Sequence, residues 1–89
     1  MNEWDEAKRA RTLRERGLDF ADAERIFAGK YFTRQDGRRE YGETRYITVG
    51  FLFDRFVVVV WTSRDGGRRI ISLRYGHDWE KERFKAYLD

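Results

Sequence analysis

The stretch Phe56–Tyr75, FVVVVWTSRDGGRRIISLRY, constrains the fold more than any other part of the chain. Its first part, Phe56–Thr62, is a continuous apolar run with four consecutive valines, which is typical of a strand covered on both faces. A turn at 63–67 contains two glycines, which adopt positive φ without strain. The second part alternates, and this period predicts a strand with two faces: Arg68, Ile70, Ser72 and Arg74 on one, and Arg69, Ile71, Leu73 and Tyr75 on the other.

The size of the chain limits it to one modest core. A length of 89 residues, with 40% hydrophobic and 17% aromatic residues, predicts a single domain over residues 1–89. The chain has no cysteine, which excludes disulfides and cysteine-based metal sites. No apolar run approaches the roughly 18 residues of a membrane helix, and the acidic segment 1–8 lacks a hydrophobic signal sequence. We therefore expect a soluble cytoplasmic protein.

The net charge of +3 is concentrated in the middle of the chain. Residues 31–76 carry nine basic residues, all arginine, against five Asp and Glu, whereas the flanking segments are nearly balanced. Arginine keeps its charge, binds phosphate through a planar fork and stacks on bases, so this segment favours contact with nucleic acid. The alternative is that these are ordinary surface arginines.

Two helices are predicted before the strand-rich middle. The first covers Glu3–Arg16, with Asp5 or Asn2 as its N-cap and Gly17 as its stop. The second follows the N-cap Asp19 and ends at Gly29. We expect their apolar stripes to face a common partner: Trp4, Ala7, Ala10 and Leu13 in the first helix, and Phe20, Ala23, Ile26 and Phe27 in the second.

The remaining segments predict an antiparallel sheet and a closing helix. A short strand, Lys30–Thr33, precedes a polar loop, Arg34–Gly42. Alternation over Glu43–Asp54 predicts a strand that a tight turn joins to the Phe56–Tyr75 hairpin. The closing helix covers Asp78–Leu88, with Asp78 as its N-cap. The predicted fold class is α+β, with two N-terminal helices, an antiparallel meander of three to four strands and a C-terminal helix.

Few side chains are suited to catalysis. His77 is the single histidine, and there is no clustered Asp/Glu metal site, phosphate-binding glycine loop or glycine-framed serine nucleophile. RNA cleavage at a 2′-hydroxyl needs cations for the phosphorane, which suits arginine, and an acid and a base, which Glu, Tyr or His can supply. The alternative is a set of surface cations with Tyr and His packed at a rim. The candidates from spacing are Ser72, Arg74, His77, Arg64 and either Tyr46 or Arg45.

A series of short motifs runs along nearly the whole chain. They are Glu3-Trp4-Asp5-Glu6-Ala7-Lys8; Leu13-Arg14 with Gly17, Phe20, Ala23 and Phe27; Asp36, Tyr41-Gly42-Glu43, Arg45 and Gly50; Val58-Val59-Val60, Trp61-Thr62 and Arg64; Arg69-Ile70-Ile71-Ser72 with Arg74; and a last helix that ends near Tyr87. In this order and spacing the series resembles the BrnT family of bacterial type II toxins, which are related in fold to RelE-type ribonucleases.

The resemblance implies a function and a partner. Members act as ribonucleases that halt growth by degrading RNA. A ribbon-helix-helix antitoxin of the BrnA type neutralises them and, together with the toxin, represses their operon. Basic and acidic side chains of the sheet and the last helix are implicated in toxicity, which on this chain indicates Glu43, Arg45, Arg64, Arg74 and Glu80 or Glu82.

The chain departs from the family pattern after the last predicted strand. Relatives usually have R-K-A-x-x-x-E, so Tyr75 replaces a lysine and Gly76 replaces an alanine. Close to Arg74 in sequence, His77 is a candidate acid or base and Trp79 a candidate for stacking on a nucleobase. The complete candidate set is Arg64, Arg74, His77, Glu80 and Glu43 for catalysis, and Arg45, Arg68, Tyr46 and Trp79 for RNA binding.

Together these features predict an endoribonuclease toxin that needs no metal or cofactor and pairs with a ribbon-helix-helix antitoxin, with a heterotetramer on operator DNA as one form of that complex. Two alternatives stay open. One is a catalytically weak or inactive toxin-fold module that binds an antitoxin or nucleic acid without cleavage, which the changes at Tyr75 and Gly76 favour. The other is an interaction protein whose apolar sheet face serves only a protein partner.

Overall fold

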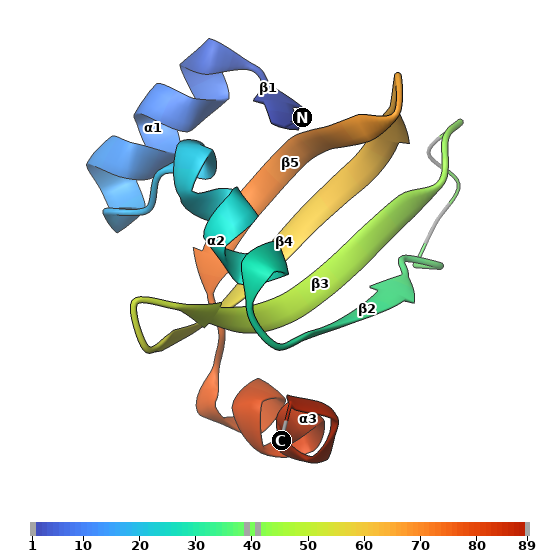
Figure 1. Cartoon of the computed structure of the whole chain (residues 1–89). Coiled ribbons are helices and arrows are strands. Elements are labelled where there is room, and N and C mark those ends of the chain that lie inside the picture. Colours follow the sequence, from blue (N-terminus) through green and yellow to red (C-terminus); the bar gives the residue numbers. More distant parts are fainter. Residues whose placement is uncertain (1, 39, 41, 89) are drawn as a thin grey trace.

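The computed structural model describes residues 2–38, 40 and 42–88 and shows a twisted five-stranded sheet with helices on both faces (Figure 1). The strand order is β1-β5-β4-β3-β2, so the first two strands of the chain lie at opposite edges. In chain order the elements are β1 (Asn2–Trp4), α1 (Glu6–Arg16), a 3-10 turn (Phe20–Asp22), α2 (Ala23–Ala28), β2 (Tyr31–Gln35), β3 (Arg45–Leu52), β4 (Arg55–Arg64), β5 (Gly67–Tyr75) and α3 (Asp78–Leu88).

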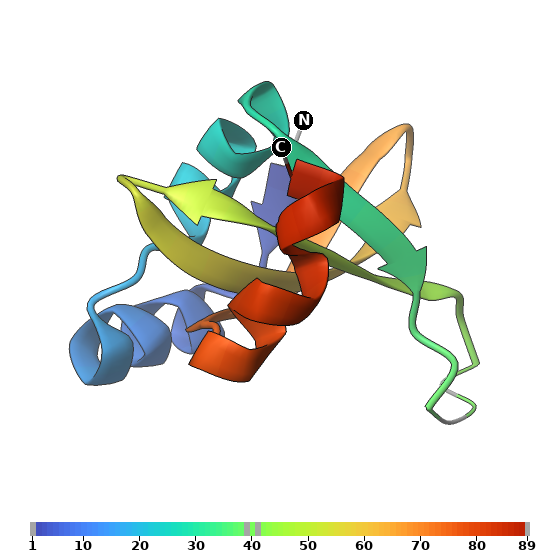
Figure 2. The same ribbon diagram turned by 90° about the horizontal axis from the view of Figure 1, so that it is seen from below.

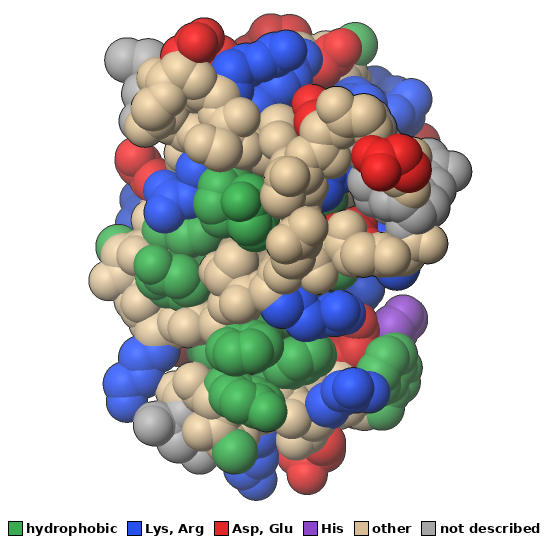
Figure 3. All heavy atoms as spheres, turned by 90° about the vertical axis from the view of Figure 1, so that its right-hand side faces the viewer, with side chains coloured by type: hydrophobic (Ala, Val, Ile, Leu, Met, Phe, Trp, Pro, Cys, Tyr) green, Lys and Arg blue, Asp and Glu red, His purple; other side chains and the backbone are tan. Residues whose placement is uncertain are grey.

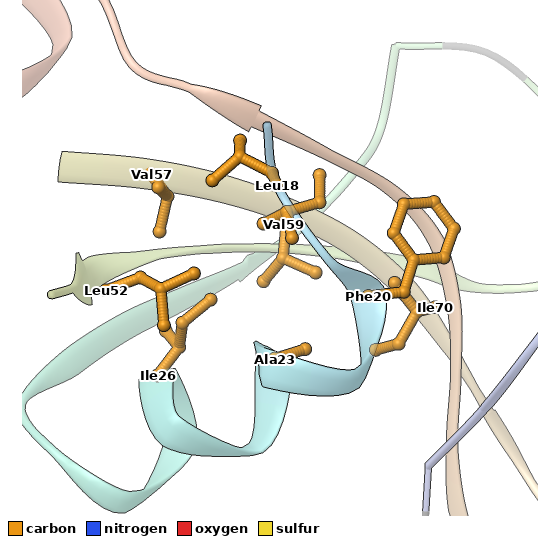
Figure 4. Packing of buried hydrophobic residues seen from close by; sticks show 9 residues of the cluster. Leu18, Phe20, Ala23, Ile26, Leu52, Val57, Val59 and Ile70 are labelled. Atoms are coloured by element: carbon orange, nitrogen blue, oxygen red, sulfur yellow. The ribbon is translucent and has the colours of Figure 1, made fainter. Parts of the chain in front are cut away.

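Each face of the sheet carries its own hydrophobic cluster. On one face the 3-10 turn and α2 cover β3, β4 and β5, with Phe20, Ala23, Ile26, Leu52, Val57, Val59, Ile70 and Leu73 buried (Figure 4). On the opposite face α3 crosses the sheet (Figure 2), and Phe84 and Leu88 pack against Ile47, Val49, Phe56 and Val58. The consecutive valines of β4 therefore alternate between two cores, which confirms the strand predicted to be covered on both faces.

The N-terminal residues form a strand where a helix was predicted. Residues Asn2–Trp4 pair in parallel with β5, so the sheet is mixed rather than purely antiparallel. The helix begins later because Asp5 caps it, accepting hydrogen bonds from the backbone N–H groups of Ala7 at 2.8 Å and Lys8 at 3.1 Å. The predicted stop is confirmed, since Gly17 has φ 71°.

The predicted burial of the α1 stripe is wrong. No residue of α1 is buried, and Leu13 is 45% exposed. Polar contacts hold the helix instead: the Arg9 guanidinium binds Asp19 at 2.7 Å and 3.1 Å, and Arg16 donates to the carbonyl of Leu73 at 2.9 Å. The periodicity identified the helix but not the exposure of its apolar stripe. The stripe is narrow and charged side chains surround it, so polar contacts rather than burial attach the helix.

The predicted alternation of β5 is also wrong, because the strand contains a β-bulge. Trp61 pairs with Ile70 and Val60 with Ser72, so Ile71 is an extra residue between them. The bulge reverses the faces after this point. Ile70 and Leu73 therefore share the α2 face, whereas Ser72 and Arg74 turn to the α3 face.

The other elements follow the predictions with shifted ends. The strand predicted at Lys30–Thr33 is Tyr31–Gln35, and β2 to β5 form four consecutive antiparallel strands. The second predicted helix begins as a 3-10 turn capped by Asp19 and continues as the short α2. In the β4–β5 turn, positive φ falls on Asp65 and Gly66, whereas Gly67 belongs to β5. Within the described part of the chain, no helix is long and apolar enough to cross a membrane.

Candidate active site

A groove of about 410 Å³ lies between the sheet and α3. Its apolar floor comes from β3 and β4, and Ser72 of β5 and Trp79 of α3 are among its lining residues. Basic side chains lie beside a cluster of hydrophobic side chains on the β2 and α3 side of the molecule (Figure 3). Three arginines line the groove, namely Arg34 from β2, Arg38 from the following loop and Arg74 from β5.

Arg74 and Glu80 form a bidentate ion pair in the groove. The Nη1 and Nη2 groups of Arg74 donate to the two carboxylate oxygens at 2.8 Å and 2.9 Å, and Nη1 also donates to the carbonyl of Tyr75 at 3.2 Å. The hydrogen bonds from Arg74 lower the pKa of Glu80 to about 2, against the opposing effect of burial, and the backbone N–H of His77 lowers it further. Glu80 is therefore a carboxylate throughout the physiological pH range.

Glu80 also fixes the start of α3. The backbone N–H of His77 donates to Glu80 Oε1 at 2.9 Å, and the carbonyl of His77 accepts from the backbone N–H groups of Glu80 and Lys81. His77 is thus the N-cap in place of the predicted Asp78, and Glu80 completes half of a capping box. The exposed imidazole lies nearly parallel to the Trp79 ring, with 6.4 Å between centroids and 11° between planes.

A second carboxylate holds a second arginine of the groove. The side chain of Asp36 is fully buried, and it accepts bonds from Nε and Nη2 of Arg38, both at 2.9 Å. The bonds to Glu80 raise the pKa of Arg74, while the positive charge of Arg38 partly opposes this rise. Two held guanidinium groups therefore repel each other across the groove, and an anion bound between them relieves that repulsion.

Comparison with known protein families decides the relationship of the chain. Residues 4–80 match the family model described as ribonuclease toxin, BrnT, of type II toxin-antitoxin system. The chain belongs to the BrnT family. Membership implies a ribonuclease toxin with an RNA substrate and an antitoxin partner. A search of curated proteins finds no match.

The sheet brings only part of the predicted site together. Arg74, Trp79 and Glu80 line the groove. Glu43 pairs with Arg45 at 3.3 Å, and Glu43 lines a neighbouring polar pocket of about 540 Å³ formed by the loop between β2 and β3. Among the described residues, no three His, Asp or Glu side chains gather in a group suited to a metal ion.

The other predicted residues lie on different surfaces. Arg64, at the hairpin tip, donates to Glu3 at 3.4 Å. Arg68 lies over the Phe27 ring at 3.6 Å, and Tyr46 stacks on Trp61 with 4.7 Å between ring centroids. This aromatic cluster belongs to the α2 face, because Phe27 and Trp61 pack against the core on that side. The bulge at Ile71 leaves Arg68 on this face and Arg74 on the other.

The departures from the BrnT pattern have local structural reasons. Tyr75 packs on the α2 face, with the Arg55 guanidinium over its ring at 4.6 Å, so position 75 points away from the Arg74 groove. A Cβ atom at Gly76 would overlap the ring of Phe56. The change at Tyr75 therefore lies outside the groove, and the change at Gly76 accommodates an aromatic side chain. Tyr41, part of the family series, lies outside the described residues.

Sequence reasoning missed Arg34 and Arg38 as groove residues. Both fall in a segment predicted to be a polar loop. Arg34 instead belongs to β2, which extends to Gln35 and pairs with β3, whereas Arg38 does lie in the loop. The signal available was the arginine-only composition of residues 31–76, which identified the segment but not its members. The burial of Asp36 two residues before Arg38 is a more specific indication, because a carboxylate rarely loses all exposure without a cationic partner, but only the structure reveals it.

The low pKa of Glu80 predicts acid-dependent stability. A carboxyl group whose pKa falls from 4.5 to about 2 on folding stabilises the fold above pH 4.5, and this contribution is lost as the pH falls toward 2. The shift corresponds to on the order of 3 kcal/mol. We expect Glu80→Gln to flatten the pH dependence of urea unfolding between pH 5 and pH 3, whereas Glu82→Gln, at an exposed position on the same helix, leaves it unchanged. Equal slopes for wild type and Glu80→Gln would contradict the prediction.

Proposed function

We propose that the protein is an endoribonuclease that needs no metal ion and cleaves RNA in the groove between the sheet and α3. The observation that carries this proposal is the concentration of Arg34, Arg38 and Arg74 around one groove, with two of them held by buried carboxylates. In transesterification the 2′-oxygen attacks phosphorus and the bond to the 5′-oxygen breaks, so negative charge grows on the phosphorane. Arginine clamps stabilise that charge without a metal.

Four side chains near the groove have roles in addition to Arg74 in this reaction. Arg74 and Arg38 bind the scissile phosphate, and the Ser72 hydroxyl provides a further donor. The Trp79 ring, which is 62% exposed, stacks on an unpaired base. The exposed imidazole of His77 is not among the groove-lining residues but lies beside the Trp79 ring, and it carries one of the two proton transfers, while solvent water carries the other. Glu43 is paired with Arg45 in the neighbouring pocket, and we assign it no step.

Purified protein incubated with single-stranded RNA in EDTA tests this proposal. We expect cleavage that leaves 2′,3′-cyclic phosphate and 5′-hydroxyl ends, and His77→Gln should lower the rate by about 10²-fold, as the loss of a general acid or base does. RNA binding without cleavage, weakening steeply with salt, would instead identify the catalytically inactive module. Cleavage only after Mg²⁺ is restored would contradict metal independence.

We also propose that the antitoxin is a ribbon-helix-helix protein and that the complex is a heterotetramer on operator DNA. Membership in a type II family supports the existence of an antitoxin, and the resemblance to BrnT supports its type. The adjacent reading frame tests the first point, because a ribbon-helix-helix gene is expected there. The mass of the co-purified complex tests the second.

A further inference from the structure

Three of the five N–H donors of Arg74 are bonded to other groups of the protein, and within the described part of the chain two are not. A guanidinium has five N–H donors in one plane, two on each terminal nitrogen and one on Nε. Both Nη1 donors are used, by Glu80 Oε1 and the carbonyl of Tyr75, and one Nη2 donor is used by Glu80 Oε2. Among the described residues nothing accepts from Nε or from the second Nη2 donor of Arg74. These two donors lie on one edge of the group, which is the geometry that binds a phosphate in a bidentate manner.

We propose that the Nε/Nη2 edge of Arg74 is the binding site for the scissile phosphodiester and that Glu80 is a positioning residue that aims this edge into the groove. This inference rests on the proposed function and specifies which atoms of Arg74 bind the phosphate. It also removes Glu80 from the proton-transfer steps for which the sequence made it a candidate.

The contacts of Glu80 explain why it positions rather than transfers protons. Its Oε1 accepts from Arg74 and from the backbone of His77, and its Oε2 accepts from Arg74. The side chain is 10% exposed, whereas that of Arg74 is 38% exposed, so an incoming phosphate meets the arginine first. The low pKa of Glu80 agrees with this role, since a general acid must carry a proton near neutral pH.

The contact between Glu80 and the start of α3 fixes the orientation of the Arg74 guanidinium. Glu80 is joined at once to β5, through Arg74, and to the N-cap of α3, through His77. A guanidinium anchored at both terminal nitrogens cannot rotate about its long side chain, so little conformational entropy is lost when phosphate binds.

Glu80→Gln tests the inference, with Glu82→Gln as the matched control on the same helix. The probe for binding is a twelve-residue single-stranded RNA with 2′-O-methyl groups, which cannot be cleaved. Glutamine keeps the size of the side chain but places an NH2 donor against an arginine donor, so Arg74 loses its anchor. We expect RNA affinity to fall about tenfold for Glu80→Gln and to stay unchanged for Glu82→Gln. Circular dichroism checks that both variants are folded.

The opposite result has an equally clear meaning. If Glu80 instead occupies the phosphate site and must be displaced, Glu80→Gln binds RNA more tightly and with a steeper salt dependence, and the inference is overturned. The pH profile of cleavage gives a second readout. We expect the profile of Glu80→Gln to be lower but unchanged in shape, whereas loss of one limb would show that Glu80 transfers a proton.

Arg74→Ala separates this inference from the proposed function. If Arg74→Ala leaves RNA binding and cleavage intact, the groove is not the active site, and both fail. If Arg74→Ala weakens binding while Glu80→Gln does not, the proposed function stands and only the positioning role of Glu80 fails.

Discussion

Replacing Arg74 with lysine is expected to lower kcat/KM for RNA cleavage by about 100-fold, the typical effect of removing one donor from a charge-stabilising site. Lysine keeps the positive charge but replaces a planar fork with a single ammonium group. It cannot bind the Glu80 carboxylate and present a second bidentate edge at the same time. The loss should fall on kcat more than on KM, because the bidentate contact strengthens as charge grows on the phosphorane.

Arg68→Lys is the matched control for this experiment. Arg68 lies on the same strand and is also partly buried, but it faces the α2 side, over the rings of Phe27 and Trp61. The two substitutions therefore change the same kind of side chain on opposite faces of β5. We expect Arg68→Lys to leave kcat/KM within about twofold of wild type, as is usual for changes away from a site. Equal losses in the two variants would show that the effect is not specific to the groove face of β5 and would argue against the groove as the active site.

That control depends on a feature that sequence reasoning did not detect. Strict alternation places Arg68 and Arg74 on one face, since they are six positions apart, an even number. One extra residue at Ile71 breaks the alternation and sends the two arginines to opposite sides. The sequence of residues 68–74 gives no sign of an extra residue in the strand. Only the pairing of β5 with β4 reveals the bulge.

The reliable predictions came from strong local signals. The valine run of β4, the left-handed stop at Gly17 and the bounds of α3 were predicted correctly, because burial, positive φ and helical periodicity are each written in a few neighbouring residues. The predictions that failed depended on distant partners. A three-residue strand such as β1 has no period of its own, and it exists because β5 offers an unpaired edge.

The candidate site divides in the same way. Arg74 and Glu80 were identified from the sequence as candidates, but their mutual bond was not, because it joins a strand to a helix across a turn. Arg38 was missed because the groove takes residues from β2, the loop that follows it, β5 and α3, which only the folded sheet brings together. A set of arginines spread over forty residues of sequence carries no spacing rule, so composition alone could not select the three that line the groove.

The second large effect is expected at Gly76, where substitution by alanine should destabilise the fold by about 2 kcal/mol. Gly76 does not have positive φ, so space rather than backbone conformation requires glycine here. The Phe56 ring fills the position that a Cβ atom would take, and Gly76 N–H donates to the carbonyl of Phe56 at 2.9 Å. That hydrogen bond prevents the two residues from moving apart without losing a second interaction.

A double-mutant cycle with Phe56→Leu measures this packing directly. Alone, Phe56→Leu removes part of a buried ring from the α3 cluster and should cost about 1 kcal/mol. Combined with Gly76→Ala, it makes room for the new methyl group. The loss of unfolding free energy in the double variant should therefore be smaller, by about 1–2 kcal/mol, than the sum of the losses in the two single variants. Free energies of unfolding in urea provide the four corners of the cycle. Additive effects would show that the ring turns aside without cost, and the glycine would then have no packing reason to replace the alanine of the BrnT pattern.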